Sequence, residues 1–317
     1  MTEPAQRHGG IAIGADRSEV EARLRDGQFF WLDLERPGET EFALLRETFG
    51  FHELAVEDSE DFGQRPKLDT YDDFVFLVVY GATDDEDLLV EVHCFYSERY
   101  LVTVHVDDCA ELERLQRRLR EASGPVEPPM VLHQVVDSLV DSFFPVLRTL
   151  DDRIDDLEDA IFVHPSSEQP KEIFALKRQL VMLRKAVGPQ RDLFATASDD
   201  LSRLPGMTEE SERSFRDVYD HLIRLGDMID TYRDLLSTAM DAHLSNVSNR
   251  LNEVTKQLTL IATIFLPLSF LTGFFGQNFR WLVDHVGGGA EFTVFGIGLE
   301  LVVLLLLLVY FRRRHWV

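Results

Sequence analysis

Apolar and polar positions alternate with different periods along the chain, and these periods divide it into three regions. In the first region, short apolar runs are separated by turn residues, which is typical of strands with intervening short helices. The runs that predict strands are 29–34, 74–80, 91–97 and 100–106, and those with helical character are 39–49 and 110–122. The acidic stretch 84–87 is expected to form a hairpin loop. We therefore predict an N-terminal α/β cytosolic domain over residues 1–125.

The second region, residues 126–255, has a helical pattern and follows a Ser-Gly-Pro sequence that favours a linker. Residues 137–162 carry many acids, for which a solvated helix face is the default interpretation and metal sensing the less favoured one. Residues 171–187 are expected to form a returning helix that stops before Gly188 and Pro189. This region is predicted to be a helical stalk.

The longest predicted element is a single helix from Glu209 to Phe275. Thr208 is a suitable N-cap, and no proline follows it until Pro267. Such a helix is roughly 100 Å long at about 1.5 Å per residue. Its apolar positions follow each other in steps of three and four, as in a coiled coil. They are Phe215, Val218, Leu222, Leu225, Ile229, Tyr232 and Leu236, and then Leu244, Val247, Leu251, Val254, Leu258, Ile261 and Phe265. One helix cannot bury this seam alone, so we expect a homo-oligomer.

The third region, residues 256–317, contains two segments that are apolar enough to cross a membrane. Residues 258–275 carry no charge, and residues 292–311 carry only Glu300. Both have about the 20-residue length that a span requires. Two buried helices of a soluble core are the alternative, but the aliphatic tract 302–309 argues against them. The chain is therefore predicted to be α+β with two C-terminal transmembrane helices.

Basic residues give the two spans an orientation. Arg312, Arg313 and Arg314 follow the second span, and Lys256 precedes the first. By the positive-inside rule, both termini are expected to be cytoplasmic. The first ten residues are polar and contain no apolar signal core. We predict a multi-pass protein of the inner (plasma) membrane, with the lipid bilayer as a partner.

A stripe of small and polar residues runs beside the apolar seam of the long helix. Steps of four and three place its members on one face. They are Asp241, Ser245, Ser248, Asn252, Thr255, Thr259, Ala262, Leu266, Ser269, Gly273 and Gly276. Copies of this face around one axis would form a narrow wet path. Close packing of helices through small residues is the alternative, and the polar extension below the span favours the pore. Leu258 and Leu266 would then be hydrophobic constrictions.

Two amides follow a glycine where this helix leaves the bilayer, in the sequence Gly276-Gln277-Asn278. Mg²⁺ prefers oxygen ligands and gives up its water reluctantly. A ring of asparagine and backbone carbonyl oxygens could therefore bind it through its hydration shell. In isolation, Gly-Gln-Asn is ordinarily a turn. The position at the mouth of a polar-faced helix favours a role in selectivity.

Glu300 is an ionisable residue inside the second span, which makes it a candidate for function. It is expected to share a face with Thr293 and Gly296 and to turn towards the first span. One hypothesis is that it makes ion flux sensitive to pH. The alternative is a structural role, in which a protonated Glu300 is hydrogen-bonded to Thr272 or Ser269.

Composition narrows the class of function. The chain has 56 acidic and 32 basic residues and a formal charge of −24, which argues against nucleic acid as a partner. This charge suits a body that attracts cations, although a well-solvated acidic surface explains it equally well. Cys94 and Cys109 lack metal-ligand spacing. No nucleotide-binding loop or catalytic set is visible, so we expect neither enzyme activity nor a cofactor.

Several segments resemble the CorA family of bacterial magnesium/cobalt channels, and together they extend over nearly the whole chain. They are His52-Glu-Leu-Ala-Val-Glu-Asp58, Gln64-Arg-Pro-Lys-Leu68, Tyr71-Asp-Asp-Phe74, Phe215-Arg-Asp-Val-Tyr-Asp-His221, Ser248-Asn-Arg-Leu-Asn-Glu-Val254, Ile261-Ala-Thr-Ile-Phe-Leu-Pro-Leu268 and Tyr310-Phe-Arg-Arg-Arg314. The resemblance implies a funnel-shaped homopentamer with a peripheral second helix.

The resemblance also implies roles for single residues. Carried over by position, the pore would be lined by Asn252, Thr255, Leu258, Thr259, Ala262, Leu266, Ser269 and Gly273, with Gly276, Gln277 and Asn278 at the selectivity mouth. Asp58 and Asp217 stand where the family's regulatory divalent site is expected, between neighbouring subunits. Mg²⁺ would be both cargo and regulator, and cytosolic Mg²⁺ bound there would hold the funnel closed.

The chain departs from the family pattern in three places. Gln277 replaces the methionine of the usual Gly-Met-Asn motif, residues 280–285 replace the acidic Met-Pro-Glu-Leu loop, and Glu300 has no expected counterpart in typical magnesium members. The related ZntB proteins, associated with zinc, also vary the middle residue. A ZntB-like zinc transporter, coupled to protons through Glu300, is therefore an alternative, and a non-conducting membrane-anchored metal sensor is a second. The choice among Mg²⁺, Co²⁺, Zn²⁺ and Ni²⁺ stays open.

Overall fold

The computed structural model describes residues 12–13, 16–83, 89–121, 127–196, 201, 204–277, 280–285 and 288–314. They belong to two compact units, Met1–Met240 and Asp241–Val317, each of which is described by itself. Helix α9 (Glu209–Phe275) contributes residues to both units and has the predicted bounds. The finer division of the chain at residues 125 and 255 stays a prediction.

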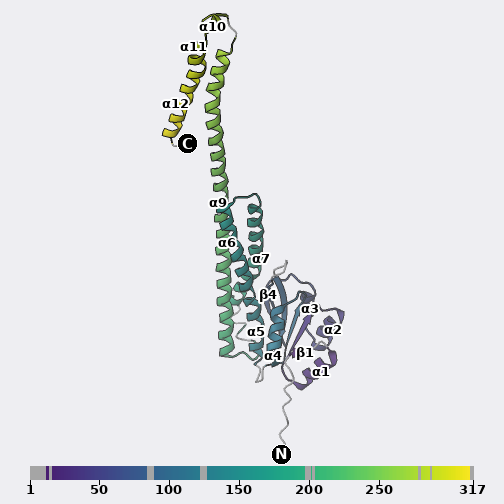
Figure 1. The fold of residues 1–317 in the computed structure, drawn as a ribbon. Coiled ribbons are helices and arrows are strands. Elements are labelled where there is room, and N and C mark those ends of the chain that lie inside the picture. Colours follow the sequence, from purple (N-terminus) through teal and green to yellow (C-terminus); the bar gives the residue numbers. More distant parts are fainter. Residues whose placement is uncertain are drawn as a thin grey trace, which may run out of the picture. The chain divides into compact units, whose positions relative to one another are not determined.

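A six-stranded mixed sheet forms the centre of the first unit (Figure 1). Its strands are β1 (Ala12–Ile13), β2 (Phe30–Glu35), β3 (Lys67–Thr70), β4 (Val75–Ala82), β5 (Leu89–Tyr96) and β6 (Tyr100–His105), in the order β1-β2-β6-β5-β4-β3. Strand β2 runs parallel to β1 and β6, and the other neighbours are antiparallel. The predicted strands correspond to β2, β4, β5 and β6. The acidic loop 84–87 lies outside the described residues.

Helices cover both faces of this sheet (Figure 1). One face packs against α1 (Arg17–Asp26), α2 (Glu39–Leu44), the π-helical segment η1 (Leu45–Phe49) and α3 (Glu53–Glu60), around a cluster that includes Phe30, Phe76 and Phe95. The other face packs against α5 (Pro128–Asp141) and α7 (Gln169–Thr196), with α4 (Ala110–Glu121) beside α5. Because both faces are buried, β4, β5 and β6 are almost continuously apolar.

The end of β4 is attached to the helical layer by three contacts. A Cβ added to Gly81 would lie 2.9 Å from Cδ2 of Leu139, so a larger residue here would require Leu139 to shift. The amide of Ala82 donates to the hydroxyl of Ser142 at 2.6 Å, and the amide of Tyr80 donates to Oε1 of Gln190 at 2.9 Å. The pairing of β4 with β3 ends where Lys67 lies opposite Val78. Beyond that point, Ser142 and Gln190 supply the acceptors that the amides of Ala82 and Tyr80 would otherwise lack.

Three helices complete the first unit: α6 (Phe143–Val163), α7 and the first part of α9. The apolar positions of α9 from Phe215 to Leu236 are buried here. The prediction that the returning helix ends at residue 187 is wrong, because α7 continues through Pro189 to Thr196. Proline removes one backbone hydrogen bond, but Val187, Gln190 and Phe194 are buried and hold the helix together beyond it.

The acid-rich stretch 137–162 extends over the end of α5 and most of α6. Ser142 separates α5 from α6, and its hydroxyl donates to the carbonyl of Leu139 at 2.5 Å while accepting the amide of Ala82. Pro145 then follows in the first turn of α6, where its missing amide is not needed. The junction is therefore fixed by the contact with β4.

The second unit consists of the remainder of α9, then α10 (Arg280–His285), α11 (Gly289–Glu291), the π-helical segment η2 (Phe292–Gly298) and α12 (Leu299–Arg313). Among the described residues, three helical stretches are long and apolar enough to cross a membrane. The one within Pro128–Val163 is 56% buried in the first unit, so it is a core segment. Those within Glu209–Phe275 and Gly289–Arg313 have no fully buried residue in the single chain and correspond in position to the two predicted spans.

Candidate cation pathway and regulatory site

Partial burial marks the face of α9 that the second span covers. In the first span, partly covered side chains recur every three or four residues, and they include Leu260, Ile264, Leu268, Leu271 and Phe275. On α12, the partly covered residues are Leu299, Glu300, Val303, Leu304 and Leu307. The helix pair therefore has a defined contact face.

The predicted pore positions lie on the opposite side of α9. Ala262, Leu266 and Gly273 each follow a covered residue by two positions, which corresponds to a rotation of roughly 200° at 3.6 residues per turn. The predicted pore-lining residues and the first residue of the predicted mouth are all exposed in the single chain. They are Asn252, Thr255, Leu258, Thr259, Ala262, Leu266, Ser269, Gly273 and Gly276. The second span thus leaves this whole face open.

The predicted mouth begins where α9 ends at Phe275. The amide of Gly276 donates to the carbonyl of Thr272 at 2.9 Å, and the amide of Gln277 donates to the carbonyl of Phe274 at 3.3 Å. A Cβ on Gly276 would lie 3.0 Å from the carbonyl oxygen of Thr272, which favours glycine here. The carbonyl end of a long helix carries a partial negative charge that attracts cations. Asn278 lies outside the described residues.

Glu300 contacts the first span through Thr272. The Oγ1 atom of Thr272 lies 2.7 Å from Oε1 of Glu300, and this hydrogen bond confirms the structural partner that the sequence predicted. Gly296 is partly covered like Glu300, whereas Thr293 is exposed and its hydroxyl donates to the carbonyl of Gly289. The predicted shared face therefore comprises Gly296 and Glu300 without Thr293.

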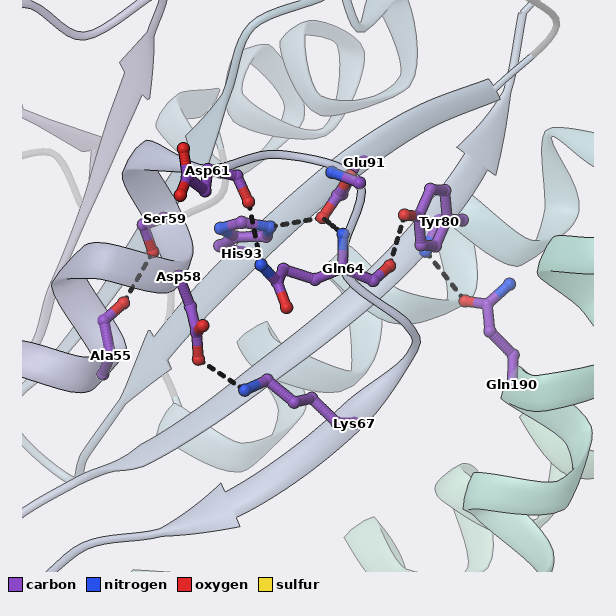
Figure 2. A network of polar contacts seen from close by, with 11 residues as sticks. Ala55, Asp58, Ser59, Asp61, Gln64, Lys67, Tyr80, Glu91, His93 and Gln190 are labelled. Atoms are coloured by element: carbon purple, nitrogen blue, oxygen red, sulfur yellow. Dashed lines mark hydrogen bonds and ion pairs between the residues drawn. The ribbon is translucent and has the colours of Figure 1, made fainter.

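Asp58 is paired with a lysine of its own chain (Figure 2). Its Oδ2 lies 2.5 Å from Nζ of Lys67, which is also 3.0 Å from Oδ2 of Asp69 and stands over the ring of Phe76. Burial by itself lowers the pKa of Lys67, but the hydrogen bonds to Asp58 and Asp69 outweigh it and raise the pKa. A divalent cation at Asp58 therefore competes with a bound ammonium group.

A buried carboxylate organises the loop between α3, which carries Asp58, and β3. Glu91 accepts hydrogen bonds from the amides of Gly63 at 2.5 Å and Gln64 at 2.9 Å, and its Oε1 lies 2.7 Å from Nε2 of His93 (Figure 2). Burial alone raises the pKa of Glu91, but the hydrogen bonds from His93 and Gly63 outweigh it, and the pKa is lowered. The loop is thereby fixed to the sheet.

Asp217 belongs to a group of acids around one imidazole on α5 and α9. The Nδ1 atom of His221 lies 3.1 Å from Oδ1 of Asp141 and 3.8 Å from Oδ1 of Asp137, and its Nε2 lies 3.8 Å from Oδ2 of Asp217. Ligand atoms of Asp137, Asp141 and His221 all lie within 4.8 Å of one another. In the described part of the chain, none of the acids Asp137, Asp141 and Asp217 is within ion-pair distance of a lysine or arginine.

The donor set of this group fits a divalent cation. Carboxylate oxygens suit Mg²⁺, and an added imidazole nitrogen suits Co²⁺, Ni²⁺ and Zn²⁺. Burial raises the pKa of Asp141, and the charge of Asp137 raises it further, as expected for acids that crowd one another without a cation. A bound cation would relieve this repulsion. Next to the group, an open depression of about 610 Å³ is lined by His133, Glu210, Arg213 and Asp217.

Among the described residues, Asp58 contacts Lys67, whereas Asp217 contacts His221, so the two acids have separate partners within one chain. Asp137, Asp141 and His221 were not among the predicted site residues. A local signal for them exists in the sequence, because Asp137 and Asp141, like Asp217 and His221, are four residues apart and share a helix face. The sequence does not show that the two helices place these faces together.

Comparisons with known proteins give a family and a fold. A family model described as CorA-like Mg²⁺ transporter protein matches residues 26–313. The cobalt/magnesium transport protein CorA of Thermotoga maritima is 34% identical over 285 residues, covering 85% of this chain and 78% of that protein. The complete structure of the CorA magnesium transporter from Methanocaldococcus jannaschii matches with a TM-score of 0.80 and 25% identity, over 90% of this chain and 91% of that one. The cytoplasmic domain of ZntB from Vibrio parahaemolyticus, at 16% identity and a TM-score of 0.60, covers 69% of this chain and 88% of that one and shares the fold alone.

Proposed function

The chain belongs to the family of CorA-like Mg²⁺ transporter proteins, which are membrane transporters of divalent metal ions, and we propose that it is a channel for Mg²⁺ and also for Co²⁺. The observation that carries this proposal is the polar face of α9, which lies opposite the face covered by the second span. A divalent cation entering a negative interior gains about 4.6 kcal/mol per 100 mV, so uptake needs no pump. The spans cross the plasma membrane with both termini in the cytoplasm.

Several copies of the chain form the channel. The seam residues of α9 in the second unit, from Leu244 to Phe265, are exposed in the single chain, including Leu251 at 62% and Leu258 at 66%. Burying one such side chain stabilises an assembly by about 1.5–3 kcal/mol. This repeated seam supports a homo-oligomer, and the family resemblance makes the expected form a funnel-shaped pentamer.

The pore is lined by the small and polar face of α9, with Leu258 and Leu266 as hydrophobic constrictions that close it by dewetting. The other lining residues are Asn252, Thr255, Thr259, Ala262, Ser269 and Gly273. Gly276, Gln277 and Asn278 form the mouth, where amide and backbone oxygens bind a hydrated ion. Support comes from the exposure of the described members of this set and from the carbonyl end of α9 at the mouth.

Cytosolic divalent cations regulate the channel through Asp217, together with Asp137, Asp141 and His221, and through Asp58. Bound cations hold the assembly closed, and when they leave, repulsion among the acids favours opening. This requires tighter binding to the closed state than to the open one. The role of Asp217 is supported most directly by its position near Asp137 and Asp141, because none of these acids is paired with a lysine or arginine among the described residues. Because Lys67 holds Asp58, that residue contributes only when its ion pair opens.

A paired substitution tests the pore. The full-length protein is reconstituted in liposomes, and Mg²⁺ entry is followed with an internal dye. Thr259→Leu should reduce entry strongly, because it replaces a hydroxyl on the pore face. The control is Phe274→Leu, at an exposed position that is not three or four residues from any member of the stripe, and it should have little effect. Equal losses in both variants, or no Mg²⁺ entry in the unchanged protein, would contradict the channel and favour a non-conducting metal sensor.

Regulation is tested in the same liposomes with Mg²⁺ on the cytosolic side. Asp217→Lys should lower the inhibition by this Mg²⁺, whereas Asp234→Lys, an exposed acid elsewhere on α9, should not. Unaltered inhibition in Asp217→Lys would count against the site.

A zinc transporter coupled to protons is the second candidate function. Gln277 at the mouth and the carboxyl of Glu300 bonded inside the membrane hairpin favour it. Competition between Mg²⁺ and Zn²⁺ for entry, with and without a pH gradient, distinguishes it from the first. The zinc transporter would be favoured if a pH gradient drives Zn²⁺ entry and Mg²⁺ does not compete with this entry.

A further inference from the structure

The hydroxyl of Thr272 stands between two oxygen atoms. Its Oγ1 lies 2.8 Å from the carbonyl oxygen of Leu268 and 2.7 Å from Oε1 of Glu300. A hydroxyl carries one hydrogen and two lone pairs. It can therefore donate to only one of these oxygens, and the other short contact needs a hydrogen from the opposite side.

Only Glu300 can supply that hydrogen, because a backbone carbonyl is an acceptor in every state. When Glu300 is a carboxylic acid, it donates to Thr272, and Thr272 donates to Leu268. Both contacts are then satisfied. An ionised Glu300 would leave two acceptors competing for one hydrogen, with a full charge inside an apolar span.

No countercharge faces this carboxyl from the neighbouring elements in the described part of the chain. Between residues 257 and 277, α9 carries no ionisable side chain. The remaining titratable groups of the described second unit lie outside residues 257–277, and the nearest of them along the chain, Glu291, is nine residues from Glu300. They are Asp241, His243, Arg250, Glu253 and Lys256 on α9, Arg280, Asp284 and His285 on α10, Glu291 on α11, and Tyr310, Arg312, Arg313 and Arg314 near the C-terminus.

We propose that Glu300 is a proton-binding site of the membrane hairpin, and that the bound proton joins α12 to α9 through Thr272. When the site empties, the O–H bond of the acid breaks, the proton passes to water or hydroxide, and the carboxylate loses its hydrogen bond to the first span. The ligand is the proton itself.

The proton site is connected to the predicted mouth. The backbone carbonyl of the same Thr272 accepts the amide of Gly276 at 2.9 Å, so one residue contacts both Glu300 and the start of the Gly-Gln-Asn sequence. Loss of the proton frees the turn of α9 that holds Gly276. This consequence for ion flux rests on the proposed channel function, whereas the proton site does not.

Infrared spectroscopy of the full-length protein in lipid tests the site without any flux. The spectrum at neutral pH should contain the carbonyl stretch of a hydrogen-bonded carboxylic acid. This band should disappear in Glu300→Gln and shift to the frequency of a less strongly bonded acid in Thr272→Val. Glu291→Gln, outside the contact, should keep it. Identical spectra for the unchanged protein and Glu300→Gln would overturn the proposal.

Flux measurements give the second readout. Glutamine keeps an N–H donor for Thr272 but cannot ionise, so Glu300→Gln should conduct Mg²⁺ equally at acidic and alkaline pH. The unchanged protein and Glu291→Gln should change their flux several-fold over the same range. A pH dependence retained in Glu300→Gln would refute the link to the mouth. If the unchanged protein passes no divalent cation while the acid band is present, the channel fails and the proton site stands.

Discussion

The imidazole of His221 approaches Asp141 with 3.1 Å between Nδ1 and Oδ1, and this contact joins the last residue of α5 to a residue of α9 that is 80 positions later in the chain. The contact places Asp137 and Asp217 around the same ring. Among the described residues, none of Asp137, Asp141 and Asp217 is within ion-pair distance of a lysine or arginine.

Replacing His221 by alanine should weaken Co²⁺ binding to the full-length protein at least about tenfold, a change of about 1.4 kcal/mol. The substitution removes the nitrogen ligand and leaves only carboxylates, which bind Co²⁺ less well. Isothermal titration of the protein in detergent measures the affinity. The matched control is His164→Ala, an exposed histidine elsewhere in the first unit. Equal Co²⁺ affinities in the two variants would exclude His221 as a ligand.

Stabilisation of the protein by Co²⁺ should increase as the pH rises above the ordinary carboxyl range. Because burial and the charge of Asp137 raise the pKa of Asp141, the folded state holds this proton more tightly than the unfolded state. The resulting stabilisation is present below the ordinary value of 3.8 and is lost as the pH rises through the raised pKa. A cation that binds the Asp141 carboxylate therefore binds more tightly, and stabilises the folded protein more, as the pH rises through the same range. Thermal unfolding with and without Co²⁺ measures this gain, and Asp141→Asn should abolish its pH dependence there.

Glu91→Gln should destabilise the first unit by about 1–3 kcal/mol, because a buried carboxylate with three hydrogen-bond partners is replaced by an amide that cannot accept them all. The lowered pKa of Glu91 means that its contribution is present above the ordinary carboxyl value and is lost as the pH falls through the lowered one. The difference in free energy of unfolding between Glu91→Gln and the unchanged protein should therefore become smaller in acid. Urea unfolding followed by tryptophan fluorescence measures it.

The control for Glu91 is Glu47→Gln, which removes an exposed ion pair with Arg17. Such pairs are worth about 0–1 kcal/mol, so this variant should unfold at nearly the same urea concentration as the unchanged protein. A similar shift in both variants would show that Glu91 has no special role in holding the loop.

Gly276→Ala should reduce Mg²⁺ entry into liposomes at least about tenfold, which corresponds to about 1.4 kcal/mol. The added Cβ would lie 3.0 Å from the carbonyl oxygen of Thr272 and would move the residues of the mouth. Gly226→Ala is the control, since nothing lies within 4 Å of a Cβ there. That change should leave entry unaltered and slightly stabilise α9. Full activity of Gly276→Ala would exclude a close fit at the mouth.

Leu251→Asp should disrupt the oligomer, because it places a charge in the exposed seam of α9 where about 1.5–3 kcal/mol of burial per copy is expected. Native mass spectrometry of the protein in detergent gives the number of copies. Asn249→Asp adds the same charge at an exposed position off the seam and should keep the oligomer intact. An intact oligomer in Leu251→Asp would show that the seam is not a contact.

The sequence predicts the long elements of this protein well because their signals are local and repeated. The bounds of α9 follow from a cap at Thr208, an uninterrupted period of three and four, and a glycine at position 276. Strands β4 to β6 are recognisable as apolar runs. Short elements such as β3 have too few residues for a period, and α7 passes a proline because burial of its other residues outweighs one lost hydrogen bond.

The sequence shows which residues share a face where one helix carries them all, as for the stripe on α9, whose role in a pore stays a prediction. The bond between Glu300 and Thr272 joins two helices, and it was expected because a lone carboxyl in an apolar span needs a polar partner. The acids around His221 come from two helices, and the ammonium group on Asp58 comes from the neighbouring strand β3. Pairings of this kind depend on tertiary packing, which no local pattern records.

The two side chains that bond the end of β4 also determine what can join the sheet. Beyond Lys67, strand β4 extends past its neighbour β3, and its amides would form an open edge. Gln190 and Ser142 occupy the amides of Tyr80 and Ala82. A strand from another copy therefore finds those donors taken. In the homo-oligomer proposed above, where several such units would be held at high local concentration, this would protect against edge-to-edge aggregation of neighbouring subunits.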